Sequence, residues 1–153
     1  MKTRRGFTLV EILIVVVILG VLASIVVPQF SSAAGDAQVS SLRSNLLAAR
    51  KQIELYKHNH EDNFPAAAGE SGTDFERRMT TQTDINGDAG TDYGPYLERL
   101  PMNCFNRLDT VRVGGAPAGA NTHGWRFDPV TGNFQADDDQ DSDGDGTLDH
   151  VNL

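Results

Sequence analysis

The chain has 153 residues and a formal net charge of −8, because 13 Lys and Arg face 21 Asp and Glu. This length suits one modest domain, and the acidic balance argues against sequence-independent nucleic-acid binding, which depends on clustered Lys and Arg. The single cysteine, Cys104, excludes an intrachain disulfide. Hydrophobic residues make up only 39% of the chain, but they are concentrated near its amino terminus.

An apolar stretch follows a short basic segment. Residues 1–6 contain three Lys or Arg, and from Phe7 to Phe30 the only ionisable side chain is Glu11. As a helix, this stretch is about 36 Å long, enough to cross a hydrocarbon core of about 30 Å. We therefore predict a transmembrane helix over residues 7–30, with its first end in the cytoplasm because basic residues flank that end.

The helical pattern continues beyond Pro28, which in a membrane span is expected to kink a helix rather than end it. Apolar side chains recur every three or four residues and form one stripe. Its members are Val39, Leu42, Leu46, Ala49, Ile53 and Tyr56. We predict an amphipathic continuation of the helix over residues 31–62, with a small globular body covering the stripe.

Residues 63–136 are expected to form that body, a head with loops and a β-hairpin. Thr110 to Val113 is rich in β-branched residues, and residues 125–136 place good turn chemistry between two apolar-polar alternations. The apolar side chains expected to face the stripe are Trp125, Phe127, Phe134 and Ala136. The predicted fold class is α+β, with a long amino-terminal helix packed on a small antiparallel sheet.

The acidic segment 137–153 contains the spacing of a calcium loop. From Asp141, acidic residues fall at relative positions 1, 3, 5 and 9, with Gly at position 6, which suits oxygen ligands around a hard cation. Position 12 is Asn152 instead of a bidentate Glu, which indicates weak affinity. The predicted Ca²⁺ ligands are Asp141, Asp143, Asp145, Thr147 and Asp149. A solvated acidic tail is the alternative.

A weaker version of the same spacing lies earlier in the chain. Its candidate calcium ligands are Asp84, Asn86, Asp88 and Asp92. Ala89 stands where a calcium loop has its turn glycine, so plain turn chemistry is the alternative for this segment.

The remaining polar residues give little sign of a reactive site. A zinc site at His58 and His60 is not expected, because zinc needs three or four converging ligands. Both side chains are expected to be solvated at the helix end. Cys104 has no basic neighbour that marks a nucleophile, so we expect it to be buried as a small hydrophobe. Without a catalytic triad pattern, phosphate loop or carboxylate pair, the sequence predicts a protein that is not an enzyme.

The amino terminus carries a family signature. Arg5-Gly6-Phe7-Thr8-Leu9-Val10-Glu11 opens an apolar span that has a proline near its end, and this resembles the amino terminus of type IV prepilins and type II secretion pseudopilins. Tyr56-Lys57, Phe64-Pro65 and Tyr96-Leu97-Glu98-Arg99-Leu100-Pro101 look like the major pseudopilin of type II secretion. One departure is residues 102–106, where the family usually has Asp-Pro-Trp.

The resemblance implies a pilin-like fold and a processed chain. In the family, a membrane aspartic peptidase removes a leader and the new amino terminus is methylated. Here the leader would be residues 1–6, with cleavage between Gly6 and Phe7 and methylation of Phe7.

Glu11 is the strongest single candidate for a functional residue. An ionisable group inside a membrane helix is expected to have a partner. After cleavage, the ammonium of Phe7 on a neighbouring subunit would be that partner, because pairing removes two desolvation costs together. Such pairs would favour subunits staggered along a fibre. The alternative is that Glu11 only lies at the level of the cytoplasmic headgroups.

The function that the resemblance implies is a structural subunit of the periplasmic fibre of a type II secretion system. Its partners would be membrane lipid, other copies of itself in a helical homopolymer, a prepilin peptidase, minor pseudopilins, and an inner-membrane assembly platform with its ATPase. We expect a single-pass protein of the bacterial inner membrane, with a cytoplasmic amino terminus and a periplasmic head. The alternatives are a type IV pilin for adhesion, motility or DNA uptake, and a secreted calcium-binding protein with an ordinary signal peptide cleaved near Ser32 and Ala34.

Overall fold

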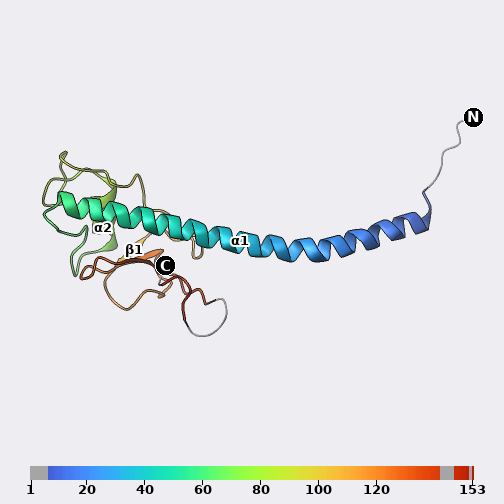
Figure 1. Ribbon diagram of the computed structural model, residues 1–153. Coiled ribbons are helices and arrows are strands. Elements are labelled where there is room, and N and C mark those ends of the chain that lie inside the picture. Colours follow the sequence, from blue (N-terminus) through green and yellow to red (C-terminus); the bar gives the residue numbers. More distant parts are fainter. Residues whose placement is uncertain (1–6, 142–146, 152) are drawn as a thin grey trace, which may run out of the picture. The chain divides into compact units, whose positions relative to one another are not determined.

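The computed structural model describes residues 7–141, 147–151 and 153, apart from the side chains of residues 27–32. Contacts within the chain divide it into two compact units, Met1–Ala37 and Gln38–Leu153. The α+β class predicted from the sequence is confirmed. The elements are α1 (Leu9–Asn59), α2 (Gly72–Thr80), β1 (Val111–Val113), β2 (Trp125–Phe127) and β3 (Phe134–Ala136) (Figure 1).

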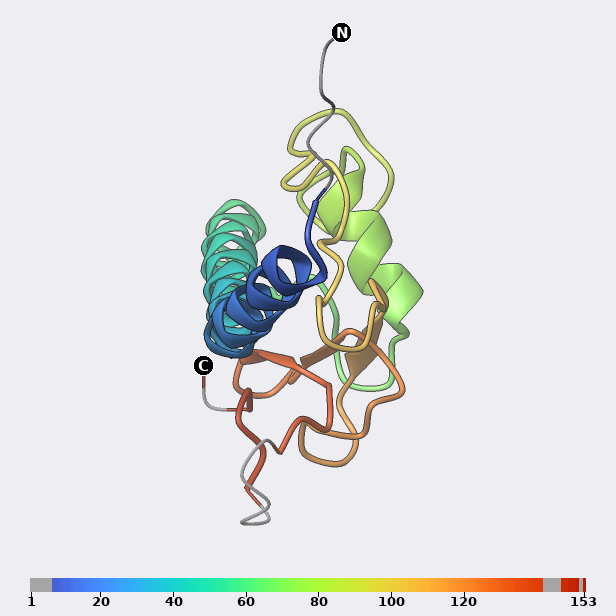
Figure 2. The same ribbon diagram turned by 90° about the vertical axis from the view of Figure 1, so that its right-hand side faces the viewer.

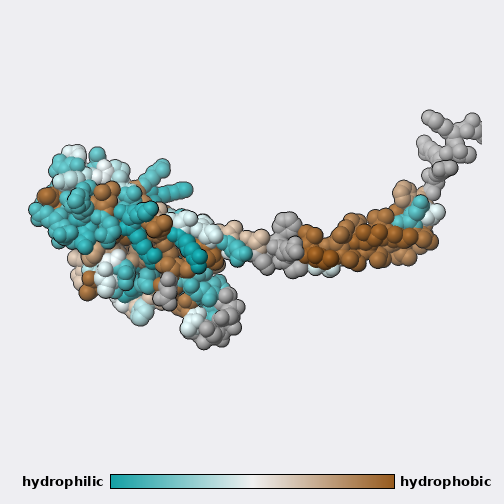
Figure 3. All heavy atoms as spheres, in the orientation of Figure 1, coloured by the Kyte–Doolittle hydropathy of each residue, from teal (hydrophilic) through white to brown (hydrophobic). Residues whose placement is uncertain are grey.

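The first unit contains the apolar half of α1. Its segment Leu9–Val26 has a mean hydropathy of 3.1, and none of it is buried within the chain. Figure 3 shows hydrophobic residues exposed along this segment. Its 18 residues are long and apolar enough to cross a membrane. A helix that is apolar all round needs an apolar environment, so this segment finds its partners outside the head.

The second unit is built around the amphipathic half of α1. The stripe residues Leu42, Leu46, Ala49, Ile53 and Tyr56 are each at most 2% exposed, which confirms the prediction, although Val39 is only half-buried. Trp125, Phe127, Phe134 and Ala136 are fully buried in the same core. Figure 2 shows this part of α1 on one side of the head and α2 on the other. The predicted contact between stripe and hairpin is therefore confirmed.

The three-stranded sheet has the order β1-β2-β3 and is mixed. β2 and β3 form the predicted antiparallel hairpin, with Trp125 opposite Ala136. β1 runs parallel to β2, with Val111 opposite Trp125, so the prediction of an antiparallel sheet was wrong for this pair. The reason is the long loop 114–124, which returns the chain to the starting edge of β1, as a parallel connection requires.

Helix α2 differs from the prediction, which gave residues 63–136 only loops and a β-hairpin. Ser71 and Asp74 form a capping box: Asp74 N donates to Ser71 Oγ at 3.2 Å, and Ser71 N donates to Asp74 Oδ2 at 3.0 Å. Phe75 and Met79 bury one face of the helix. Gly72 lies so close to the Val111 carbonyl that a β-carbon would collide with it. The Ser-x-x-Asp spacing at residues 71–74 is the signal in the sequence for the start of this helix.

Candidate functional site

Thr8 and Glu11 cap the start of α1. Both the main-chain nitrogen and Oγ1 of Thr8 donate to Glu11 Oε2 at 2.8 Å, and Glu11 N donates to Thr8 Oγ1 at 3.2 Å. This reciprocal pair is a capping box, and the Thr-x-x-Glu spacing at residues 8–11 is its sequence signal. The carboxylate at the edge of the apolar span is therefore hydrogen-bonded within its own chain.

The predicted amino terminus, Phe7, lies next to this cap in the chain. Phe7, whose residue surface is 79% exposed, directly precedes the Thr8 amide that bonds Glu11. Gly6 lies outside the described residues. Cleavage at Gly6, methylation of Phe7 and pairing of Glu11 with a neighbouring subunit stay predictions.

The acidic loop is closed at its base. Asp149 N donates to Gln140 O at 2.9 Å, so the two ends of the predicted calcium loop meet beside Asp141, while Thr147 is exposed in the described part of the loop. Asp143 and Asp145 lie outside the described residues. In the part of the chain that the structure describes, no three His, Cys, Asp or Glu side chains gather as a metal site. Calcium at this loop stays a prediction.

A buried polar cluster lies below the loop. His150 Nδ1 is 2.6 Å from Asp138 Oδ1, and both side chains are almost fully buried. Asn103 Nδ2 donates to Asp138 Oδ2 at 2.7 Å, and the ring of Phe105 lies 4.0 Å from that of His150. These contacts offset the cost of burying polar groups. No local sequence pattern marks this cluster, whose members are far apart in the chain.

Asp137 forms a second buried ion pair. Arg112 Nη2 donates to Asp137 Oδ1 at 2.6 Å, and the Asp137 side chain is 0% exposed. Gly119 N and Ala120 N also donate to this oxygen, at 3.1 and 3.3 Å. The alternative of a wholly solvated tail from residue 137 was therefore wrong for Asp137 and Asp138. Both belong to the head, because each has partners that replace water.

His60 is also buried, contrary to the expectation that it is solvated. Its Nδ1 lies 2.8 Å from Tyr56 O and its Nε2 lies 3.0 Å from Thr83 Oγ1. Its ring stacks on that of Tyr56, with centroids 3.7 Å apart. The sequence shows that His60 lies at the end of the helix, but no pattern in it indicates that the loop containing Thr83 covers this side chain.

Cys104 is half-buried, and its Sγ donates to Gln38 O at 3.4 Å. Burial raises the pKa of its thiol above the ordinary value, which keeps the group protonated and unreactive. Its position therefore agrees with a packing role for the side chain.

The weaker calcium candidate forms a tight turn. Asp84 Oδ1 accepts hydrogen bonds from Asn86 N at 2.9 Å and from Asp88 N at 3.0 Å. Asp92 contributes its main-chain N–H to Thr83 O at 3.2 Å. The Asp84 carboxylate thus serves the turn, and calcium at this loop stays a prediction.

Comparison with known proteins finds a family model that matches the amino terminus and relatives that match most of the chain. Residues 1–27 match the family model described as the prokaryotic N-terminal methylation motif. The type II secretion system core protein G of Klebsiella pneumoniae is 46% identical over 103 residues, which are 67% of this chain and 70% of the relative.

Two further relatives have the same name. Core protein G of Escherichia coli K12 is 43% identical over 118 residues, covering 76% of this chain and 77% of the relative. That of Pseudomonas aeruginosa is 33% identical over 102 residues, covering 67% and 68%. No solved structure matches the chain.

Proposed function

Because the chain belongs to the family of type II secretion system core protein G, we propose that it is a structural subunit that polymerises into the periplasmic fibre of a type II secretion system. The observation that carries this proposal is the apolar segment Leu9–Val26, none of which is buried within the chain and which has Glu11 near its start. The names of the relatives favour secretion over the predicted alternative of a type IV pilus. The role is structural rather than enzymatic.

We propose two states for the Glu11 carboxylate. In the single subunit it is held by Thr8 through the capping box. In the fibre it also pairs with the Phe7 ammonium of a neighbouring copy, exposed when the leader is removed after Gly6. The cap supports this pairing because it fixes the carboxylate at the start of α1, the end at which cleavage would expose the ammonium. Opposite charges that meet in an apolar environment share their desolvation cost.

The proposed location and partners follow from this assembly. The apolar segment anchors the subunit in the inner membrane, with the head in the periplasm and the basic residues 1–6 in the cytoplasm. A prepilin peptidase removes the leader, and a membrane platform with its ATPase adds subunits to a fibre that also contains minor pseudopilins. The main partner is a second copy of the same chain.

The test is the variant Glu11→Ala. We expect the leader to be cleaved normally and the chain to reach the membrane, but fibre incorporation to be lost, because the Phe7 ammonium then has no carboxylate. Mass spectrometry measures cleavage, and shearing followed by quantification of sedimented fibres measures assembly. Glu54→Ala, which removes an exposed carboxylate from the same helix, serves as the matched control and should assemble normally. Normal fibres from Glu11→Ala would overturn the pairing.

We also propose that the acidic loop binds Ca²⁺ in the periplasm. The ligands would be the carboxylates of Asp141, Asp143, Asp145 and Asp149, with the Thr147 carbonyl. The bond between Asp149 N and Gln140 O supports the proposal because it holds the ends of the loop together. A bound ion would brace the end of a head that has no disulfide.

Calcium removal tests this role. At a calcium concentration about one hundred times Kd, binding adds roughly 2.7 kcal/mol to the stability of the head, which for a domain of this size corresponds to a rise in Tm of about 10 °C. Chelation should abolish that rise, as should Asp145→Asn. Asp109→Asn, an exposed substitution outside the loop, should keep it. Identical melting curves with and without calcium would contradict the proposal.

A further inference from the structure

The side chain of Arg107 is exposed at one end of the head and has no acceptor among the described residues. Its backbone is left-handed, with φ of 60°, and is held by a hydrogen bond from Arg107 N to Asn103 O at 2.8 Å. Non-glycine residues in this conformation tend to mark functional positions. The loop thus holds the backbone of Arg107 in place and presents a cation that has no partner among the described residues.

A polar pocket lies at the other end of the head. Its volume is about 330 Å³, and its lining includes Asp62, Asn63, Phe64, Glu70, Asn86 and Pro129. Asp62 is exposed, has left-handed backbone with φ of 64°, and has no side-chain partner among the described residues.

The pocket suits an arginine better than a neutral or acidic guest. Arg78 also lines it and pairs with Glu70 at 2.6 Å, so Asp62 is the lining carboxylate whose side chain has no partner among the described residues. The walls formed by Phe64 and Pro129 are apolar and suit the methylenes of a long cationic side chain. The ring of Phe64 already contacts a cation, since Lys57 Nζ lies 5.0 Å from its centroid.

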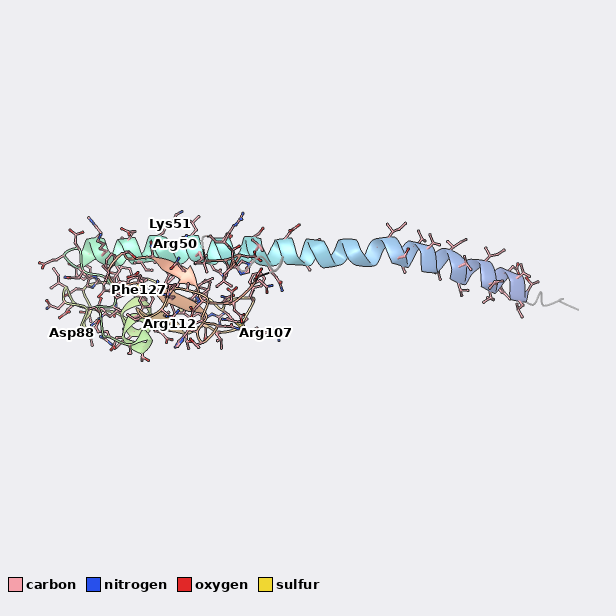
Figure 4. All side chains as sticks on the ribbon, turned by 90° about the horizontal axis from the view of Figure 1, so that it is seen from below. Arg50, Lys51, Asp88, Arg107, Arg112 and Phe127 are labelled. Carbon is pink, nitrogen blue, oxygen red and sulfur yellow. The ribbon has the colours of Figure 1, made fainter. Side chains whose placement is uncertain are left out.

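The cation and the pocket are separated along α1. Cys104 Sγ contacts Gln38 O, so the loop that contains Arg107 lies at the first residue of the second unit, whereas Asp62 follows the end of α1 at Asn59. At about 1.5 Å per residue, these points are about 30 Å apart. Figure 4 shows Arg107 at the opposite end of the head from Asp88, whose loop contributes Asn86 to the pocket.

We infer that Arg107 of one copy inserts into the Asp62 pocket of a second copy of this chain. The contact joins two different surfaces, so it repeats without closing and generates an open fibre. Copies that touch in this way are displaced by about 30 Å along the direction of α1. Arginine and carboxylate give such a contact its direction and register. The inference rests on the proposed self-assembly and names a surface that carries it.

Charge exchange in the full-length chain tests the contact. We expect Arg107→Glu and Asp62→Arg each to lower fibre yield about tenfold, in line with the coupling measured for close charge pairs across interfaces. The double variant, which restores opposite charges with their positions exchanged, should recover most of that yield. Arg99→Glu removes a different exposed arginine and serves as the control with unchanged yield. Single variants that assemble normally, or a double variant no better than the singles, would overturn the contact.

A disulfide experiment separates this inference from the proposed function. In a Cys104→Ser background, copies with Arg107→Cys are mixed in the membrane with copies with Asp62→Cys and oxidised. A linked dimer is expected, and Arg99→Cys in place of Arg107→Cys should give none. If the wild-type chain forms no fibre, the proposed function fails, and the presence or absence of the linked dimer still decides whether the two head surfaces meet.

Discussion

The two halves of α1 differ in whether their apolar side chains are buried within the chain. Apart from Glu11 near its start, Leu9–Val26 is apolar on all sides, and none of the segment is buried within the chain. From Leu42 onwards, one stripe is fully buried and the other faces are polar or exposed. The first half therefore depends on molecules outside the chain for its stability, and the second half depends on the head. One secondary-structure element thus contains both an assembly surface and a folding core, and substitutions in the two halves should have different consequences.

The largest expected effect comes from truncating the core. Trp125→Ala should lower the free energy of unfolding of the head by about 3 to 5 kcal/mol, because it removes a fully buried side chain and leaves a cavity. Ile18→Ala removes a large side chain from the half of α1 that is unburied, and should leave that free energy unchanged. Denaturant unfolding of the detergent-solubilised chain, followed by circular dichroism, measures both. Equal losses would show that the two halves fold as one unit.

Breaking a buried ion pair should have a somewhat smaller effect. Asp137→Asn should cost about 3 kcal/mol, because it leaves Arg112 poorly paired in a largely buried site. The neighbouring Asp139→Asn, at an exposed position, should change the free energy of unfolding by less than about 0.5 kcal/mol. The same denaturant experiment measures this contrast. If the two variants behave alike, Asp137 is not an internal anchor of the head.

The smallest expected effect is a pH dependence at Glu70. The hydrogen bond from Arg78 holds the pKa of this carboxyl below its ordinary value of 4.5. A lowered pKa in the folded state means that the pair stabilises the head at neutral pH, and that this stabilisation is lost as pH falls from about 4.5 through the folded pKa. The contribution is below about 1 kcal/mol because the pair is partly exposed.

Acid unfolding curves measure the Glu70 contribution. Glu70→Gln should flatten the acid dependence of the free energy of unfolding, whereas Glu98→Gln, at an exposed position, should not. A wild-type curve that is already flat between neutral pH and the acid transition of the other carboxyls would contradict a role for this pair.

Much of the fold was predictable because its signals are local. The apolar run, the stripe from Leu42 to Tyr56 and the hairpin that starts at Trp125 each depend on residues close together in the chain, and the structure places them as expected. The resemblance at residues 5–11 predicted the family that the comparisons then showed.

The features that were missed depend on contacts between distant residues. The direction of β1 is set by the path of loop 114–124, which has no pattern that distinguishes a hairpin from a crossover. Asp138 and His150 find each other only after the head has folded. The capping boxes that begin at Thr8 and Ser71 are different, because their Thr-x-x-Glu and Ser-x-x-Asp spacings are visible in the sequence.

The chain contains one tryptophan, and the structure buries it completely at the centre of the head. Its indole Nε1 donates to Pro101 O at 2.7 Å, and its ring stacks near Phe134. Its intrinsic fluorescence therefore comes from a single apolar environment, and a red shift of that emission will report exposure of the core. The subunit thus needs no added dye for its head to be followed optically during membrane insertion or incorporation into a polymer.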